Sequence, residues 1–270
     1  NPREVLETVA EAGYDGVDLD AEPDRIPVEK FNEVRDMATS LGLKIPFLVG
    51  AWGYWHAGEE RNLASPDAAI RANAVAYAKK CVDLAATFDE PPCYEIVPCP
   101  IESGYPRTSI PYSELRENFL RTTEEITKHA LERNVNIAIE PINRFESYAG
   151  FMNTIPEVMN LIEQLEMENL YILADFFHIN MEDGPITEAL QRAGGRLYHI
   201  HLADSNRQAP GTGHIDFLDV IRTLNEIGFD GYLALDSIPP LPDWKTLVRQ
   251  TLPFMKQMEA TAALQEKIRH

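Results

Sequence analysis

Four side chains with metal-ligand chemistry stand at the ends of successive apolar runs in the second half of the sequence. They are Glu140, Asp175, His201 and Asp236, separated by 35, 26 and 35 residues. Each interval has room for one strand and one helix, so the four runs can be neighbouring strands of a parallel sheet. Three carboxylates and an imidazole form an oxygen-rich set that suits a hard or borderline divalent ion. The pattern predicts a site for Mn²⁺ or Mg²⁺, with Co²⁺ or Zn²⁺ as alternatives.

The metal hypothesis depends on the coincidence across four strands, because a single carboxylate at a strand end is ordinarily a turn or helix-cap residue. His199 and His201 lie on one face of their strand, since side chains alternate with a period of two. His201 is nearer the carboxyl end of the strand and is the predicted ligand. His199 is predicted to lie deeper, as a hydrogen-bonded core histidine.

Strands and helices that could position these residues alternate along the whole chain. Seven apolar runs predict strands, and eight longer segments have helical periodicity. The predicted strands are 16–20, 45–49, 94–98, 135–141, 170–176, 197–203 and 232–236. The predicted helices lie near 2–12, 28–41, 66–87, 112–133, 155–165, 186–193, 217–227 and 243–258.

The alternation predicts an α/β fold, a (β/α)8 TIM barrel whose first strand is missing from the N-terminus of the given chain. The sequence opens on a helix, with Asn1 as its cap and Pro2 at its first position. We therefore expect the natural gene to encode a strand before Asn1. No linker or composition shift divides the chain, so residues 1–270 are predicted to form a single barrel domain. An open doubly wound sheet is the alternative, but no Gly-rich phosphate loop follows the first strand.

Composition restricts the partners and the compartment. The chain has 24 Lys and Arg against 43 Asp and Glu, which gives a formal net charge of −19. Nucleic acids and anionic membranes attract basic surfaces, so neither is expected as a partner. No apolar run approaches the roughly 18 residues of a membrane span. The three cysteines form neither a disulfide framework nor a zinc motif, which favours the cytoplasm.

Two loops are candidates for substrate contacts. The segment 205–217 is long for a connection between strand and helix and is predicted to be a lid or substrate loop. It carries Arg207 close to the predicted ion. Trp52, Tyr54 and Trp55 follow another strand, and aromatic walls beside polar groups suit sugar rings.

Three motifs resemble those of a known superfamily. They are Glu140-Pro-Ile-Asn-Arg-Phe-Glu146, Asp175-Phe-Phe-His178 and His199-Ile-His-Leu-Ala-Asp-Ser-Asn-Arg207. The chain resembles the xylose-isomerase-like sugar phosphate isomerase/epimerase superfamily over nearly its whole length, and is most similar to the D-tagatose 3-epimerase group of ketose 3-epimerases. Hydroxypyruvate isomerases and inosose dehydratases are related groups.

The resemblance implies a role for each matching residue. Glu140, Asp175, His201 and the residue at position 236 would bind the metal, and Glu146, His178 and Arg207 would hold oxygens of the substrate. Glu140 and Asp236 would move protons on opposite faces of the sugar. The family usually has Glu where this chain has Asp236, and the shorter side chain leaves epimerase, isomerase and dehydratase chemistry open.

The predicted activity is that of a metal-dependent sugar isomerase or epimerase acting on a ketose. A metal that chelates the carbonyl and the neighbouring hydroxyl stabilises an enediolate, and two carboxylates can then act as base and acid. A metal-dependent lyase or dehydratase of the same fold, acting on an inosose or a keto-glycoside, is the alternative. A neutral sugar is favoured, because the last loop lacks glycine and has no cation before Lys245. The C-terminal helix and tail are candidates for a homo-oligomer contact.

Overall fold

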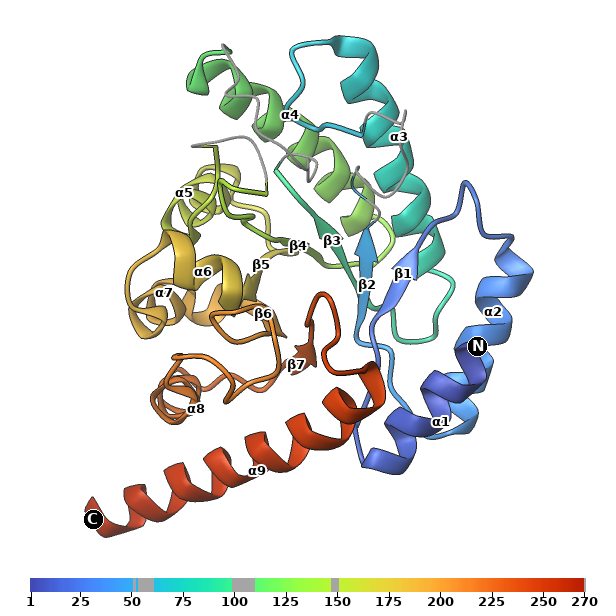
Figure 1. The fold of residues 1–270 in the computed structure, drawn as a ribbon. Coiled ribbons are helices and arrows are strands. Elements are labelled where there is room, and N and C mark those ends of the chain that lie inside the picture. Colours follow the sequence, from blue (N-terminus) through green and yellow to red (C-terminus); the bar gives the residue numbers. More distant parts are fainter. Residues whose placement is uncertain (51, 53–60, 99–109, 147–150, 270) are drawn as a thin grey trace.

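Seven parallel strands form one curled sheet whose spatial order is the chain order (Figure 1). The computed structural model describes residues 1–50, 52, 61–98, 110–146 and 151–269. The strands are β1 (Leu19–Ala21), β2 (Phe47–Gly50), β3 (Cys93–Ile96), β4 (Ile137–Ile139), β5 (Leu170–Asp175), β6 (Leu197–Leu202) and β7 (Tyr232–Leu235). All seven predicted strands are present with shorter or shifted bounds. The first begins later than predicted, because Gly16 makes only an isolated bridge with Lys44.

Helices surround the curled sheet on its outer face (Figure 1). They are α1 (Pro2–Ala12), α2 (Val28–Ser40), α3 (Ala68–Ala85), α4 (Tyr112–Leu131), α5 (Ile155–Leu165), α6 (Phe176–Glu182), α7 (Ile186–Ala193), the 3-10 turn η1 (Gly194–Arg196), α8 (Phe217–Glu226) and α9 (Trp244–Arg269). The helix α6 was not predicted, because its seven residues are too few to show a periodicity. The last helix is longer than predicted, since α9 continues through Pro253 to Arg269. None of the helices in the described part of the chain is long and apolar enough to cross a membrane.

Local capping explains where several helices begin. Asn1 accepts a hydrogen bond from the Arg3 N–H, which confirms the predicted cap of α1. Thr154 and Glu157 form a reciprocal capping box at the start of α5. These side chains satisfy N–H groups that the first helical turn would otherwise leave unpaired.

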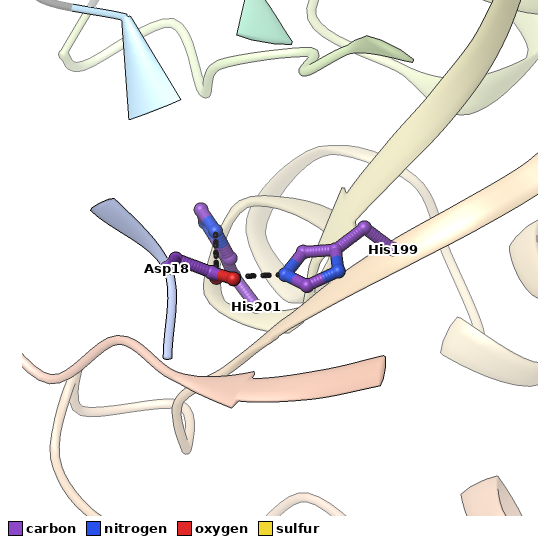
Figure 2. A group of neighbouring side chains, drawn as sticks. All are labelled: Asp18, His199 and His201. Carbon is purple, nitrogen blue, oxygen red and sulfur yellow. Dashed lines mark hydrogen bonds and ion pairs between the residues drawn. The ribbon is translucent and has the colours of Figure 1, made fainter. Parts of the chain in front are cut away.

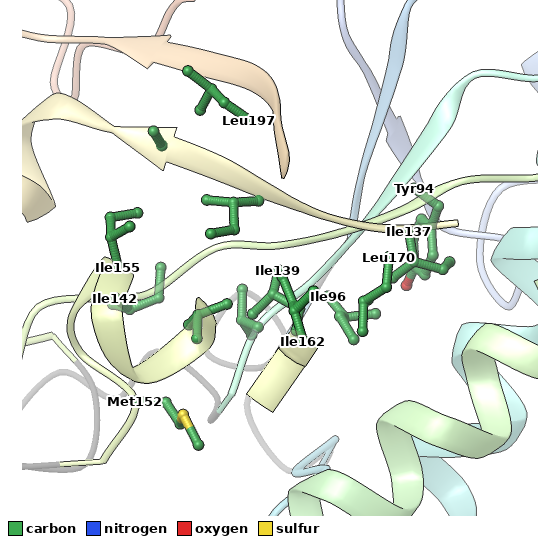
Figure 3. Packing of buried hydrophobic residues seen from close by; sticks show 14 of the residues in the cluster. Tyr94, Ile96, Ile137, Ile139, Ile142, Met152, Ile155, Ile162, Leu170 and Leu197 are labelled. Atoms are coloured by element: carbon green, nitrogen blue, oxygen red, sulfur yellow. The ribbon is translucent and has the colours of Figure 1, made fainter. Parts of the chain in front are cut away.

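Apolar residues pack on both faces of the sheet, as expected for parallel strands covered by helices. Ile137 and Ile139 of β4 are fully buried in the large cluster between sheet and helices (Figure 3). Ala138, between them, faces the opposite side and packs in a small inner cluster with Phe47, Cys93 and Leu173. Full burial of an Ile side chain contributes about 1.5–3 kcal/mol, so packing on both sides stabilises β4.

The two edge strands, β1 and β7, are not paired with each other in the described part of the chain. A cavity of about 620 Å³ lies between them, lined by Gly16–Asp18, by 230–235 and by side chains of α1 and α9. The sheet is nevertheless strongly curled, and the curl brings Asp18 beside β1 within hydrogen-bond distance of His199 of β6 across the interior. A strand before Asn1 would belong to chain outside this sequence, and it stays a prediction.

A buried carboxylate at the junction of α5 and α6 predicts a pH-dependent stability. Asp183 Oδ1 accepts a hydrogen bond from the Ile155 N–H (3.0 Å), while Oδ2 is buried without a partner among the described residues. Burial raises the pKa of Asp183 to about 7; the Ile155 hydrogen bond opposes the rise, and the Glu157 and Glu182 carboxylates add to it. The folded protein therefore binds more protons than the unfolded chain between about pH 4 and 7, and its stability falls as the pH rises through this window.

We expect Asp183→Asn to be more stable than the natural chain at pH 8, by about 1–2 kcal/mol after allowance for solvent screening. At pH 4 the gain should vanish, because the natural carboxyl is then protonated when folded. Urea unfolding at the two pH values measures this difference. The exposed Asp230→Asn serves as control and should show no such pH dependence. A gain that is equal at both pH values would contradict the assignment.

Candidate active site

A cavity of about 590 Å³ opens at the carboxyl ends of the strands. Each of the seven strands, or a segment next to it, contributes residues to the lining of this cavity. The contribution beside β5 is His178, which lies in the following helix α6. The lining residues that carry polar or charged side chains are Asp18, Asp20, Glu22, Trp52, Glu95, Glu140, Glu146, His178, His201, Arg207 and Asp236. This end of a barrel is where enzymes of the architecture carry out catalysis.

Strand register brings the four predicted ligands to one level of this cavity. Asp175, the last residue of β5, stands opposite His201 of β6. Asp236 directly follows β7, and its N–H bonds to the Leu202 carbonyl of β6. Glu140 follows β4 and is tied in the same way to β3 through the Ile96 carbonyl. The four residues therefore converge because each ends its strand at a similar height.

The distances between these side chains suit a shared cation. His201 Nδ1 lies 3.4 Å from Glu140 Oε1 and 3.7 Å from Asp236 Oδ2. Ligand atoms of Asp175, His201 and Asp236 all lie within 4.8 Å of one another, as do those of Glu140, Asp175 and His178. Because the two groups share Asp175, the four predicted ligands and His178 form one continuous cluster.

The donor set fits a divalent ion. His201 Nδ1 is buried and has no hydrogen-bond partner among the described residues, although it faces two carboxylates. A buried nitrogen of this kind gains a partner when it gives its lone pair to a cation. Together with three carboxylate ligands it forms the mixed set expected for Mn²⁺ or Mg²⁺, with Co²⁺ or Zn²⁺ also compatible.

Electrostatic coupling in the cluster is strong. Burial opposes the charge of Glu140, but His201 and His178 lower the pKa of that carboxyl to about 2. Burial likewise opposes protonation of His201, but Glu140, Asp236 and Asp175 raise the pKa of the imidazole to about 10. Burial is also the main cause that raises the pKa of Asp236. Without an ion, the carboxylates are thus balanced by the proton on His201 and by nearby Arg207.

Arg207 links two of the predicted ligands. Its guanidinium donates to Asp175 Oδ2 (2.5 Å) and to Asp236 Oδ2 (2.6 Å), and it lies 4.9 Å from the centre of the Phe177 ring. The Arg207 backbone is in the left-handed region, with φ 62°, which few side chains other than glycine adopt readily. The surrounding loop holds this residue in place.

That loop is built around the buried carboxylate of Asp204. The Asp204 side chain accepts hydrogen bonds from the N–H groups of Ser205 (2.7 Å), Gly211 (2.8 Å) and Ile215 (3.2 Å). Burial opposes its ionisation, but these and further backbone N–H groups lower the pKa of Asp204. The segment predicted to be a lid or substrate loop is therefore wound around a fixed anion, and it carries Arg207 to the cluster of predicted ligands.

Gly213 allows this winding, and its substitution tests it. A Cβ at Gly213 would come 2.3 Å from Asp204 Oδ1 and 2.4 Å from Ser205 Oγ. We expect Gly213→Ala to destabilise the protein by about 1–3 kcal/mol, because the loop must shift away from its anion. Thermal unfolding and limited proteolysis measure the effect. Gly184→Ala is the control, since its Cβ would meet nothing within 4 Å. Equal stability of the two variants would contradict the role of Asp204.

Of the two remaining predicted substrate residues, His178 belongs to the cluster and Glu146 lies beside it. His178 Nδ1 is 2.7 Å from Asn143 Nδ2 and 3.6 Å from Glu146 Oε2, and its Nε2 is 3.6 Å from Asp175 Oδ2. Glu146 is partly exposed at the opening of the cavity. Each predicted site residue therefore lies in or beside one cavity.

Sequence reasoning missed four polar residues of this region. Glu95 is buried in β3, where burial and then Glu140 raise the pKa of its carboxyl well above the usual range. Arg61 makes a buried two-point ion pair with Glu22. Asn143 contacts His178. An acidic residue inside an otherwise apolar strand was the one available signal, and it pointed to Glu95.

The predicted aromatic wall is only partly described. Trp52 is buried, and its Nε1 donates to the Glu95 carbonyl (3.1 Å), so it lines the cavity as a fixed wall. Tyr54 and Trp55 lie outside the described residues.

The family model described as "Xylose isomerase-like TIM barrel" matches residues 6–258. The chain belongs to this family. This membership confirms the predicted TIM-barrel fold and the resemblance drawn from the three motifs.

Several characterised relatives of this barrel family are sugar epimerases. The chain is 28% identical to the D-psicose 3-epimerase of Ruminiclostridium cellulolyticum over 237 residues. The matched region covers 86% of this chain and 76% of the relative. It is 25% identical over 267 residues to the 3-dehydro-D-guloside 4-epimerase of Escherichia coli, which covers 94% and 95% of the two chains. A crystal structure of D-psicose 3-epimerase with D-tagatose, from Clostridium cellulolyticum, matches with a TM-score of 0.84 at 23% identity, over 95% of this chain and 93% of that one. This last likeness shows a shared fold.

Proposed function

We propose that this chain, as one barrel domain spanning residues 1–270, is a divalent-metal-dependent sugar epimerase of the ketose 3-epimerase kind. The relatives support a sugar epimerase, and the site supports proton transfer beside a carbonyl. The observation that carries the proposal is that Glu140 and Asp236 both approach the same nitrogen of His201, at 3.4 and 3.7 Å, within a cavity of about 590 Å³ that has room for a sugar.

We assign the metal to Glu140, Asp175, His201 and Asp236. An ion held there would polarise the carbonyl of the substrate and stabilise the negative charge that develops when the neighbouring proton leaves. Mn²⁺ or Mg²⁺ suits the three carboxylates best, and Co²⁺ or Zn²⁺ is compatible with the histidine.

The side chains divide the remaining work. Glu140 and Asp236 serve as base and acid, so that a proton removed on one face of the sugar is returned on the other. Arg207, His178 and Glu146 orient the carbonyl and hydroxyl oxygens. Arg207 is the sole Lys or Arg that lines the cavity within the described part of the chain, which favours a neutral sugar over a phosphorylated one.

The short side chain of Asp236 favours a second candidate function, that of a dehydratase. A carboxylate misplaced by about 1 Å can cost on the order of 100-fold in rate. In a dehydratase one base removes the proton, a β-leaving group departs, and Asp236 needs only to bind the metal.

The cytoplasmic location and a homo-oligomer are also proposals. The buried free thiols of Cys81 and Cys93 support the first, and the projecting end of α9 supports the second (Figure 1).

Hydrogen exchange with solvent tests the proposal. The protein is stripped of metal, reloaded with Mn²⁺ or Mg²⁺, and incubated in D₂O with a panel of ketohexoses, ketopentoses and keto-glycosides. We expect deuterium at the carbon beside the carbonyl and the appearance of an epimer. Loss of water from the product would assign the dehydratase instead. Absence of exchange across the panel, with metal bound, would overturn both.

A further inference from the structure

Asp18 is an acidic residue of the cavity without a role in the proposed reaction. It lies just before β1, with its side chain 12% exposed, and it lines the cavity together with His201. Figure 2 shows its carboxylate between the imidazoles of two histidines that come from β6. Asp18 Oδ2 is 2.8 Å from His199 Nε2 and 3.9 Å from His201 Nε2.

The two nitrogens of His201 face different groups. Nδ1 faces Glu140 and Asp236, whereas Nε2 faces Asp18. If Nδ1 is to give its lone pair to an ion, the proton of the neutral ring must be on Nε2. An ionised carboxylate accepts hydrogen bonds and cannot donate them, so Asp18 favours the ring form that carries its proton on Nε2. At 3.9 Å this contact is electrostatic or mediated by one water molecule.

His199 holds the carboxylate in this position. The His199 ring is stacked on Phe47, with ring centres 4.3 Å apart and planes 7° apart, and its Nε2–H donates to Asp18. The same ring meets His201 edge to face, with centres 5.6 Å apart. His199 is fully buried, so the carboxylate of Asp18 is anchored from the core side and faces His201 on the other. The contact with Asp18 also accounts for the buried position of His199, which was predicted to be a hydrogen-bonded core histidine.

We propose that Asp18 is a positioning residue, which together with His199 fixes the ring orientation and the tautomer of His201 for binding a divalent ion through Nδ1. The inference rests on the proposed metal site. Carboxylates that orient a metal-bound histidine in this way typically contribute 10–100-fold to metal affinity or activity.

Metal affinity and histidine NMR test the proposal separately from catalysis. Metal-stripped protein is titrated calorimetrically with MnCl₂. We expect Asp18→Ala to raise the dissociation constant by about 10–100-fold, and Asp18→Asn to raise it less, because an amide oxygen still accepts a hydrogen bond. Asp20→Asn is the matched control, since it removes one charge from the same face of the same segment, and should change the constant by about threefold at most.

The Mg²⁺-loaded protein labelled with ¹⁵N-histidine gives the second readout. We expect His201 to carry its proton on Nε2 in the natural chain and to show mixed ring forms in Asp18→Ala. If Asp18→Ala does not fold, Asp18→Asn and its spectrum decide the question.

Three results would overturn the proposal. The first is an Asp18→Ala variant with the metal affinity and His201 spectrum of the natural chain. The second is two ions per natural chain and one per Asp18→Asn chain, which would make Asp18 a ligand of a second ion. The third is a natural chain that binds no divalent ion, which would overturn the proposed metal site as well, whereas the first two leave that site standing.

Discussion

Replacement of Glu140 by Gln is expected to reduce solvent exchange and epimer formation by at least about 10³-fold, with the fold retained. The amide keeps the size of the side chain but removes the charge that His201 and His178 stabilise. It removes a proposed metal ligand and a proposed proton-transfer group together, so its effect should exceed that of either role alone. Deuterium incorporation by the metal-loaded variant measures the loss.

Glu132→Gln is a matched control, because this residue is exposed just after α4 and does not line the cavity. It should retain full activity. Circular dichroism of both variants verifies the fold. Should Glu140→Gln keep more than about a tenth of the activity, the assignment of Glu140 as base and ligand would be wrong.

Replacement of Arg61 by Met is expected to lower the free energy of unfolding by about 3–5 kcal/mol. Arg61 and Glu22 are both buried, and two hydrogen bonds of 3.0 and 3.1 Å join them. The guanidinium also lies 3.7 Å from the centre of the Tyr77 ring. Loss of the guanidinium removes two hydrogen bonds and one opposite charge from the buried Glu22 carboxylate, and breaking a buried ion pair in this way is costly. Urea unfolding measures it.

Two further variants make this test specific. Arg121→Met breaks an exposed pair with Glu117 and should cost less than about 1 kcal/mol. Glu22→Gln combined with Arg61→Met should recover part of the loss, because no buried charge is then left unpaired. If Arg61→Met is as stable as Arg121→Met, the buried pair contributes nothing to the free energy of unfolding.

Residues that end a strand were predictable, because both their type and their spacing are visible in the sequence. Glu140, Asp175, His201 and Asp236 each follow an apolar run, and parallel strands necessarily bring such ends to one side of the sheet. Helix starts such as Thr154 were predictable for a similar reason, since a capping box is a local pattern.

Contacts between distant segments were not predictable. Asp18 pairs with His199 across 181 positions, and Glu22 pairs with Arg61 across 39 positions. Asp18 and Asp20 lie two positions apart in one predicted strand, and nothing in their local sequence distinguishes the one that pairs with a buried histidine. Their difference depends on how tightly the sheet curls, which no local pattern specifies.

The order of the strands along the chain has a consequence for biosynthesis. A growing chain exposes Glu140 and Asp175 before β6 and β7 have been made, so a partly synthesised barrel offers carboxylates but neither His201 nor Asp236. A high-affinity cluster forms only after β7 has joined the sheet. At the proposed metal site, ion capture would then be a late step that follows completion of the sheet, and a captured ion would slow amide hydrogen exchange from β4 through β7 together rather than in one strand.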